Sequence, residues 1–418
     1  MIAAVVALIA LSIVLDRQGP DRPKQPAGSG PALTPADVAR IARRVERLRA
    51  LRFERPVKPL FKSRAEAARL QLAEAAKDYS PAKRRADEES LKLLGLLRPR
   101  DSIPGALSAV AREEVLGFYD PRSERLVVVR DRTASRSLLE ITLAHELVHA
   151  LEDQRFGLHE SDDPGDDEAL ARSALAEGTA TTVMAEYALR YFGIDDALAL
   201  FNSVDSGAKL PTYIEDALLF PYEQGIDFVA TFRAGSRSWK ALDNVIRLRP
   251  PESAEQVLHP RKYAVGELPA AIGTPDLATA AGSGWQRLGA SSVGEFDLRE
   301  LFKILEGSPR PRAAAGWDGG RFELWQRGDA QDCTAPCVSR DAGFMSLAWD
   351  TVADRAAAER ELASAFEKGL GARFAGRRAG ARLWSSRGGI VALRGARRQT
   401  KIVFAPDGET AGRLLALR

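Results

Sequence analysis

Two of the chain's four histidines lie four residues apart in the stretch LAHELVHALEDQ, residues 143–154. Four residues make about one turn of an α-helix, so His145 and His149 would share a face and could bind the same ion. Neutral imidazole is a good zinc ligand, whereas Glu146, next to the first histidine, could reach a water held by that ion. The pattern His-Glu-x-x-His therefore predicts His145 and His149 as zinc ligands and Glu146 as the general base that acts on a metal-activated water.

The same helix has an apolar face opposite these polar residues. At about 100° per residue, four apolar residues fall between about 120° and 200° from His145: Leu139, Leu143, Leu147 and Ala150. This stripe would pack on a core and direct the polar face toward one ion. The alternative, a histidine pair that only lines a core, is disfavoured by the spacing and by the stripe behind it.

A zinc site of this kind needs a third protein ligand and leaves one position open for water. Of the two remaining histidines, His159 lies in an acidic loop and His259 is 110 residues beyond His149. A carboxylate from the next helix is therefore the better candidate, and we expect it to be Glu177, with Glu186 as the competitor. Small residues around Glu177 would let its helix pack closely against the first: Ala174, Ala176, Gly178 and Ala180.

Hydrolysis of an amide also requires a hydrogen-bond donor for the oxyanion that forms on attack. His259, Tyr263 and Tyr222 are the candidates, and we place His259 and Tyr263 in the catalytic site. For His259 the alternative is a buried, hydrogen-bonded structural histidine. Asp153 is expected either to orient a ligating imidazole or to be a surface acid in the last turn of the helix.

The stretches HELVHALEDQRFGL and ALAEGTA, with GFYDPRSERLVVV before them and LHPRKY after them, resemble predicted bacterial zinc metallopeptidases of the gluzincin type. That family is distantly similar to thermolysin, and the resemblance spans roughly residues 110–265. It implies a zincin-like fold, one catalytic Zn²⁺ held by His145, His149 and Glu177, Glu146 as base, and a peptide or protein substrate. It also implies that the strand RLVVVRD lies along the cleft edge, where an extended substrate could pair with it; an ordinary interior strand is the alternative.

The pattern of the chain predicts an α+β protein in which helices position this site. Helices are expected from Thr34-Pro35 onward, over 64–96, 136–156 and 166–192, and a hairpin is expected with its turn at 121–124. Beyond a boundary near 300, six segments should form strand, strand, helix, strand, strand and helix. We therefore expect a mostly helical zincin-like domain with a small sheet at 37–300 and a small α+β domain at 301–418.

Residues 1–36 form a separate N-terminal segment. The first fifteen are apolar and uncharged, short of the roughly 20 residues of a spanning helix, and a Pro/Gly-rich linker follows them. There is no basic residue before the run and no small-x-small cleavage site after it, which suits an uncleaved anchor or a start that clips the true N-terminus. We expect the protein to be exported, either membrane-anchored or secreted or periplasmic, with membrane contact through this segment; a buried N-terminal helix is the alternative.

Composition limits the partners. The chain of 418 residues is 45% hydrophobic with a formal charge of +3, and its arginines are spread along the chain without interleaved aromatics. Nucleic acid is therefore not an expected partner. In an exported chain, Cys333 and Cys337 of DCTAPC would form a local disulfide; a metal site and an unpaired thiol pair are the alternatives.

Together these features predict a zinc-dependent peptidase, most simply an endopeptidase. Two other functions stay open: a catalytically silent binding or assembly protein of the cell envelope on a zincin fold, and a zinc hydrolase of a non-protein amide. The intact Glu146 argues against the first alternative, because loss of this glutamate is the simplest mark of an inactive peptidase.

Overall fold

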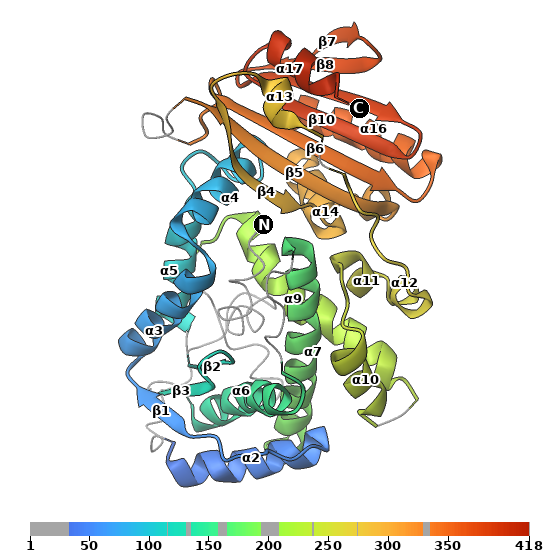
Figure 1. Cartoon of the computed structure of the whole chain (residues 1–418). Helices are drawn as coiled ribbons and strands as arrows, with labels where there is room; N and C mark the ends of the chain where they lie inside the picture. Colours follow the sequence, from blue (N-terminus) through green and yellow to red (C-terminus); the bar gives the residue numbers. More distant parts are fainter. Residues whose placement is uncertain are drawn as a thin grey trace.

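The computed structural model describes residues 33–417, apart from residues 115, 131–134, 158–164, 194–208, 236–237, 274 and 329–334. A mostly helical part comes first along the chain, and a large antiparallel sheet with helices on its faces follows (Figure 1). The α+β class expected from the sequence is confirmed at this level.

The helical part contains three strands and, in the described residues, these helices: α2 (Pro35–Arg49), α3 (Arg64–Asp78), α4 (Pro81–Leu93), α5 (Ile103–Glu114), α6 (Arg136–Phe156), α7 (Asp166–Tyr191), α9 (Thr212–Arg233), α10 (Lys240–Leu248), α11 (Ala254–Leu258) and α12 (Pro260–Val265). The expected helix starting near Thr34 is α2, where Thr34 and Asp37 form a capping box. The helix expected over 64–96 is two helices, because Ser80 and Pro81 start a new one with the serine as its cap.

The small sheet has the order β1-β3-β2, with β1 at Pro59–Lys62, β2 at Gly117–Asp120 and β3 at Arg125–Val129. Strands β2 and β3 form the expected antiparallel hairpin, and β1 pairs with β3 in parallel. The expectation that RLVVVRD lies along the cleft edge, where a substrate could pair with it, is therefore wrong, and the alternative of an interior strand is correct, because β3 is the central strand and has a partner on each side. The strand at the edge beside α6 is β2, which packs against that helix.

Helix α6, which carries the His-Glu-x-x-His pattern, has the bounds expected from the sequence. The Ser135 hydroxyl accepts a hydrogen bond from the Leu138 amide at its start, and Gly157 ends it in the left-handed conformation that glycine adopts without strain. The helix is buried on both faces, including His145, Glu146 and Asp153. A helix with so many buried polar groups needs polar partners from the elements around it.

Helices α7 and α9 run side by side and cross at two glycines (Figure 1). A Cβ atom on Gly178 of α7 would lie 2.3 Å from the backbone carbonyl group of Gly225 of α9, and one on Gly225 would lie 2.1 Å from the Ala174 carbonyl oxygen. The two backbones are thus in direct contact, which a side chain at either position would prevent. The sequence analysis assigned Gly178 to a close approach to α6; the structure shows that it serves the approach to α9.

The C-terminal sheet has seven strands, all antiparallel to their neighbours, in the order β4-β5-β6-β10-β9-β8-β7. Its elements are α13 (Leu277–Ala281), β4 (Trp285–Ser292), α14 (Glu295–Glu306), α15 (Pro311–Ala314), β5 (Trp317–Arg327), β6 (Asp341–Trp349), α16 (Val352–Lys368), β7 (Arg373–Arg378), β8 (Ala381–Ser386), β9 (Gly389–Ala396), β10 (Gln399–Ala405) and α17 (Gly408–Leu415). Figure 1 shows this sheet at one end of the molecule and α2 at the other.

Two strands of this sheet were not expected, and one expected strand is a hairpin. Strand β4 pairs with β5, so the sheet begins at Trp285, ahead of the boundary placed near 300. Strand β7 is short and rich in Arg and Gly, so its sequence lacks the alternation of apolar and polar residues that indicates a strand. The segment ARLWSSRGGIVALRG divides into β8 and β9 because the chain turns before Gly389, which has a φ of 120°.

Polar contacts connect the two parts of the chain. The Asp167 amide donates to the Ser292 hydroxyl at 2.9 Å, the Tyr213 hydroxyl donates to Asp297 at 2.6 Å, and the Cys337 amide donates to Glu89. Cys337 is in a disulfide bond; Cys333, the chain's other cysteine, lies outside the described residues.

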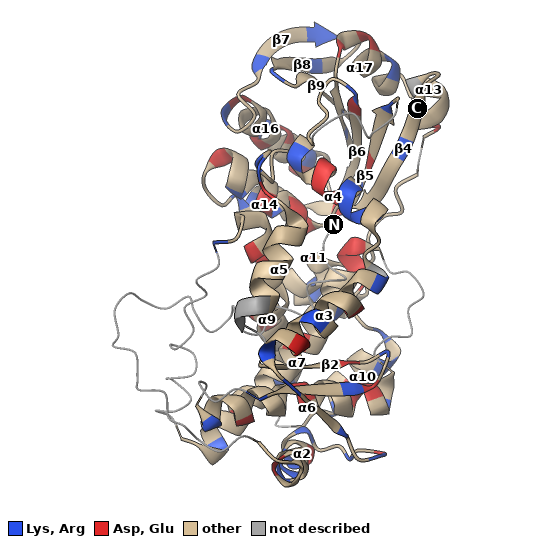
Figure 2. Ribbon diagram, turned by 90° about the vertical axis from the view of Figure 1, so that its left-hand side faces the viewer, with Lys and Arg blue, Asp and Glu red and all other residues tan. Residues whose placement is uncertain are grey.

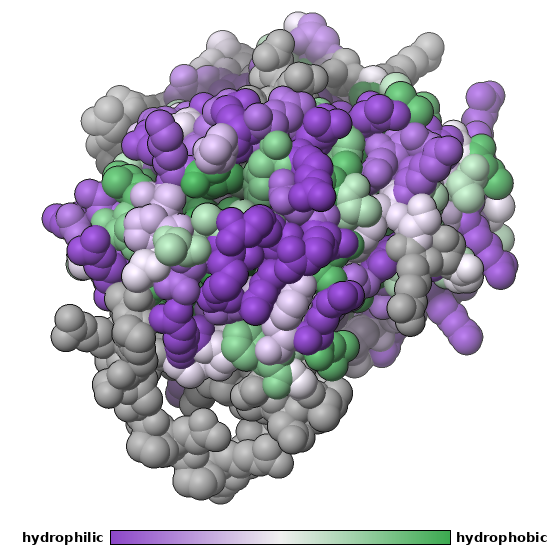
Figure 3. Space-filling view, turned by 90° about the horizontal axis from the view of Figure 1, so that it is seen from below, coloured by the Kyte–Doolittle hydropathy of each residue, from purple (hydrophilic) through white to green (hydrophobic). Residues whose placement is uncertain are grey.

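The end of the molecule where α2 lies is mostly hydrophilic, with small scattered apolar patches (Figure 3). Helix α2 accordingly buries Val38, Ile41 and Val45 and turns its charged face outward. Of the helices that the structure describes, none is long and apolar enough to span a membrane. The anchor expected in residues 1–15 and the linker after it lie outside the described residues, apart from residues 33–36.

Candidate metal centre

The structure brings together the three side chains expected to bind zinc. The His145 and His149 Nε2 atoms are 3.0 Å apart, and Glu177 Oε2 lies 3.0 Å from the first and 3.4 Å from the second. His145 and His149 come from α6, and Glu177 comes from α7, which packs against it. These donor atoms therefore surround one point.

The chemistry and spacing of this cluster fit zinc. Ligands at about 2.05 Å from a tetrahedral ion are about 3.3 Å from one another, close to the separations found here. Two nitrogens and one carboxylate oxygen are a donor set that zinc uses in catalytic sites, and three ligands leave the fourth position open. Glu186, the competing acid, instead accepts from Arg233 at 2.5 Å, so its carboxylate is already paired.

Burial and mutual contact set the electrostatics of the cluster. Burial opposes the charge on Glu177, but the two imidazoles outweigh it and lower the pKa of this carboxyl to about 2. Burial also disfavours the charged form of His149, yet Glu177 beside it raises the pKa of the imidazole to about 9. For His145 burial dominates and lowers the pKa. The Glu177 carboxylate and the His149 imidazole thus hold complementary charge inside the protein, whereas the neutral form of His145 is favoured.

Glu146 lies on the same helix and meets the edge strand β2. Its Oε2 atom accepts a hydrogen bond from the Tyr119 amide at 2.8 Å, and burial raises the pKa of this carboxyl to about 7. The Tyr119 hydroxyl also donates to Asp153 at 2.7 Å. Tyr119 thus ties the edge strand to two acids of α6. The sequence analysis did not single out Tyr119, and nothing in the pattern of its neighbours would have identified it.

Of the three oxyanion-donor candidates, the structure places Tyr222 beside the cluster. Its ring stacks on His145 with centroids 6.2 Å apart, and its hydroxyl interacts with the Glu177 carboxylate. Tyr222 lies on α9, three residues before Gly225. The close crossing of α7 and α9 at Gly178 and Gly225 therefore brings this tyrosine to the carboxylate.

His259 and Tyr263, which the sequence analysis placed in the catalytic site, have other partners. His259 Nε2 lies 2.9 Å from Glu295 Oε2 and 3.5 Å from Arg299. The Tyr263 hydroxyl donates to the Arg249 carbonyl oxygen at 2.6 Å. Both residues lie at α11 and α12, which are nearer the C-terminal sheet than α6 is (Figures 1 and 2). The expectation that they line the metal cluster does not match this arrangement.

Two buried acids of α6 bind arginines of α2 and so connect the two helices. Glu140 accepts from Arg40 and Arg44 and from the Tyr187 hydroxyl of α7. Glu152 accepts from Arg49 at 2.6 Å, and both of these side chains are fully buried. Acids in an otherwise apolar helix indicate from the sequence that buried cationic partners must exist. Which residues these partners are depends on the fold.

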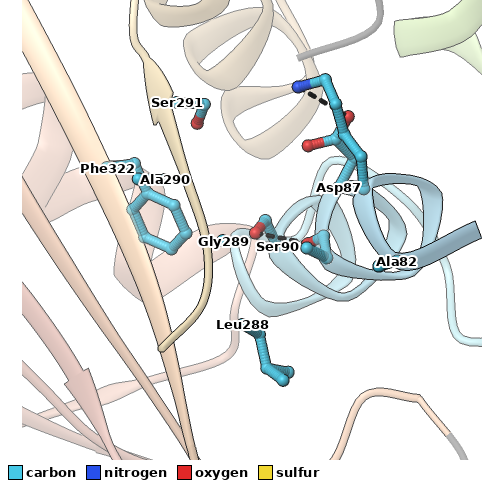
Figure 4. Close-up of a pocket in the computed structure, with 10 residues that line it drawn as sticks. Ala82, Asp87, Ser90, Leu288, Gly289, Ala290, Ser291 and Phe322 are labelled. Atoms are coloured by element: carbon cyan, nitrogen blue, oxygen red, sulfur yellow. Dashed lines mark hydrogen bonds and ion pairs between the residues drawn. The ribbon is translucent and has the colours of Figure 1, made fainter. Parts of the chain in front are cut away.

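Other polar clusters in the described part of the chain have a different character. Glu255, Glu267 and Asp350 surround the Lys262 ammonium group, each at 2.7 Å, so a lysine already fills that acidic cage. A cavity of about 210 Å³ lies between α4 and strands β4 and β5 (Figure 4). Asp87 is its one acidic lining residue and no histidine lines it, so it offers no metal-ligand set.

The family model that matches this chain covers the C-terminal sheet and not the residues of the metal cluster. Residues 284–415 match the model of a family described as a domain of unknown function, DUF8575, and this segment begins next to β4. No curated protein matches the chain in sequence. The crystal structure of a "putative hydrolase with a novel fold" from Chloroflexus aurantiacus is similar over 63% of this chain and 96% of that chain, with 20% identity and a TM-score of 0.37. At this TM-score the similarity assigns neither a fold nor an activity to this chain.

Proposed function

We propose that the chain is a zinc-dependent peptidase of the gluzincin type, with a zincin-like arrangement of α6, α7 and β2 around one Zn²⁺. The observation that carries the proposal is the convergence of His145, His149 and Glu177 at separations of 3.0–3.4 Å. When bound, zinc would polarise the scissile carbonyl and lower the pKa of a bound water toward neutrality.

Glu146 is the residue that we assign as the general base. It follows His145 on the helix, so its carboxylate lies beside the cluster without being one of its three ligands, and the Tyr119 amide holds one of its oxygens. A carboxylate fixed in this way can take a proton from the attacking water and pass it to the leaving amine. Tyr222 takes the donor role that the sequence analysis gave to His259 and Tyr263, because its hydroxyl is next to Glu177.

The edge of the small sheet supports a peptide as substrate. Among the strands that the structure describes, β2 pairs with β3 alone, and its Tyr119 amide is directed at the catalytic base. An extended peptide that adds to this edge would have its main chain parallel to the strand and its carbonyl groups near the metal cluster. We assign β2, in place of β3, as this strand.

The decisive experiment combines metal analysis with hydrolysis of an unbiased peptide library. Glu146→Gln should retain zinc and fold while it abolishes cleavage, and Glu177→Gln should lose zinc. Glu186→Gln is the matched control, because that acid pairs with Arg233 and should leave metal content unchanged. Wild-type protein that binds zinc but cleaves no peptide would favour the hydrolase of a non-protein amide; wild-type protein without zinc would favour the binding protein. Full activity of Glu146→Gln would refute the mechanism.

A further inference from the structure

In the part of the chain that the structure describes, three pairs of acidic side chains join the helical part to the part that contains the large sheet. Each pair takes one acid from either part, and all of these side chains are buried. The pairs are Asp216 of α9 with Glu300 of α14, Asp167 of α7 with Asp297 of α14, and Glu89 of α4 with Asp341 of β6. Carboxylates held close together repel each other, so acid pairs at a buried contact need a further charge or a proton.

The first pair shares a lysine. The Lys303 ammonium group forms an ion pair with Asp216 and lies 3.6 Å from Glu300 Oε2. The carboxyl groups of Asp216 and Glu300 are also hydrogen-bonded to each other. Two carboxylates have no hydrogen to donate, so this bond requires a proton on one of them. Two acids with one proton and one lysine are together electrically neutral.

The pair between α4 and β6 has the same kind of bond. The Glu89 and Asp341 carboxyl groups are hydrogen-bonded to each other, with oxygens within 4.8 Å. The Cys337 backbone amide donates to Glu89, and the Gln326 side-chain amide donates to Asp341 at 2.7 Å. These donors are neutral, so a proton on one acid halves the charge that the pair would otherwise bury.

The third pair meets at the start of α14. The Gly294 amide donates to Asp297 Oδ2 at 2.9 Å, and a Cβ atom on Gly294 would lie 1.8 Å from Asp167 Oδ1. Both carboxyl groups therefore lie against the same glycine. The Tyr213 hydroxyl of α9 donates to Asp297, whereas Glu295 of α14 adds negative charge near Asp167.

Other charged groups at this contact have partners of opposite charge. Lys83 of α4 lies 3.0 Å from Asp166 of α7 and 3.6 Å from Asp87. Arg299 of α14 lies 2.6 Å from Glu295. In the three pairs, by contrast, an acid of one part faces an acid of the other.

Burial and the neighbouring acid raise the pKa of one carboxyl in each pair to about 8. These carboxyls belong to Glu300, Asp167 and Asp341. An acid that is freed into water titrates near about pH 4, so separation of the two parts releases these protons when the pH lies between about 4 and 8. The contact therefore has the full stability from these protons below about pH 4 and loses it as the pH rises to about 8.

We propose that protons shared by these acid pairs fasten the sheet-containing part of the chain to the helical part, and that this contact weakens as the pH rises. Figure 1 shows α14 between the large sheet and the ends of α7 and α9. The contact thus holds the two helices that carry Glu177 and Tyr222 to the metal cluster. None of the paired acids belongs to that cluster, so the proposal does not depend on the peptidase activity.

The test is hydrogen exchange of the full chain, followed by mass spectrometry between about pH 5 and pH 8 and corrected for the intrinsic exchange rate. The opening constant of the α14 amides should rise with pH in the wild type. In the triple variant Asp167→Asn, Glu300→Gln, Asp341→Asn, an amide takes the place of each protonated carboxyl and can donate to the partner acid. The rise should then be smaller by up to about tenfold per pH unit for each proton replaced.

The single variant Glu300→Gln keeps the proposal testable if the triple variant does not fold, because its rise should be smaller by up to about tenfold per pH unit. The matched control changes three exposed acids, Asp227→Asn, Glu252→Gln and Glu409→Gln, and should keep the wild-type rise. An equal rise in the wild type and in the Glu300→Gln variant would overturn the proposal. Added Ca²⁺ that protects wild-type α14 at high pH, but not the triple variant, would assign the acid pairs to a cation in place of a proton and would refute it too.

Discussion

The crossing of α7 and α9 can be tested by adding one methyl group. In Gly178→Ala, the new Cβ would lie 2.3 Å from the carbonyl group of Gly225. Nonbonded carbon and oxygen atoms need about 3.4 Å or more, so the helices must separate by about 1 Å locally. The obstructing atoms belong to the backbone and cannot rotate away, which makes this an overpacking substitution that costs about 1–3 kcal/mol of unfolding free energy.

The same displacement should reach the metal cluster. Glu177 precedes Gly178 in the chain, and Tyr222, which contacts the Glu177 carboxylate, lies one turn before Gly225. Moving the helices apart separates this carboxylate from its partner and from the imidazoles of α6. We expect zinc affinity to fall by about ten- to a hundredfold, as for loss of a group that orients a metal ligand.

Urea unfolding of zinc-free protein measures the packing cost, and competition with a chromogenic chelator measures zinc affinity. Gly412→Ala is the control, because a Cβ at this helical position of α17 meets nothing within 4 Å. Alanine should stabilise that helix by about 0.5–1 kcal/mol and leave zinc affinity unchanged. The reasoning fails if Gly178→Ala matches the control in both stability and zinc affinity, since the helices would then not meet at this glycine.

Three further changes test other parts of the structure. Arg49→Met should lower the free energy of unfolding by about 3–5 kcal/mol, because it removes the cationic partner of the fully buried Glu152 and of Asp243. Adding Glu152→Gln should recover part of the loss, and a cost below about 1 kcal/mol in chemical unfolding would contradict this. Burial, together with the Glu89 carboxyl, raises the pKa of Asp341 to about 8, so the folded state keeps a proton that the unfolded state releases above about pH 4. The stability that this carboxyl contributes is full below about pH 4 and is lost as the pH rises to about 8. Asp341→Asn should therefore flatten the decline of Tm with pH, and an unchanged decline would exclude Asp341 as its source. Tyr222→Phe should retain zinc and lower kcat by about 10²–10³-fold, and wild-type kcat would remove Tyr222 from the catalytic site.

The sequence alone determined the local features of the candidate site. The spacing of His145 and His149 and the stripe behind them required one helix, and the caps Ser135 and Gly157 set its bounds. The choice of Glu177 over Glu186 also followed from neighbouring small residues, and the structure places Glu177 with the two histidines. The histidine pair could be inferred because the geometry of a helix converts residue spacing directly into spatial proximity. Glu177 was the right choice although Gly178 beside it serves the approach to α9 and not the expected approach to α6.

Contacts between distant elements were decided only by the tertiary structure. Sequence offered three donors for the oxyanion, and no local pattern distinguished Tyr222 from His259 and Tyr263, because the choice depends on how α9 crosses α7 at Gly178 and Gly225. Likewise, the hairpin was evident from its pattern, yet the pairing of β1 with β3 turned the expected edge strand into the central one. Which strand is at the edge depends on a partner more than fifty residues away, and local sequence carries no signal for that partner.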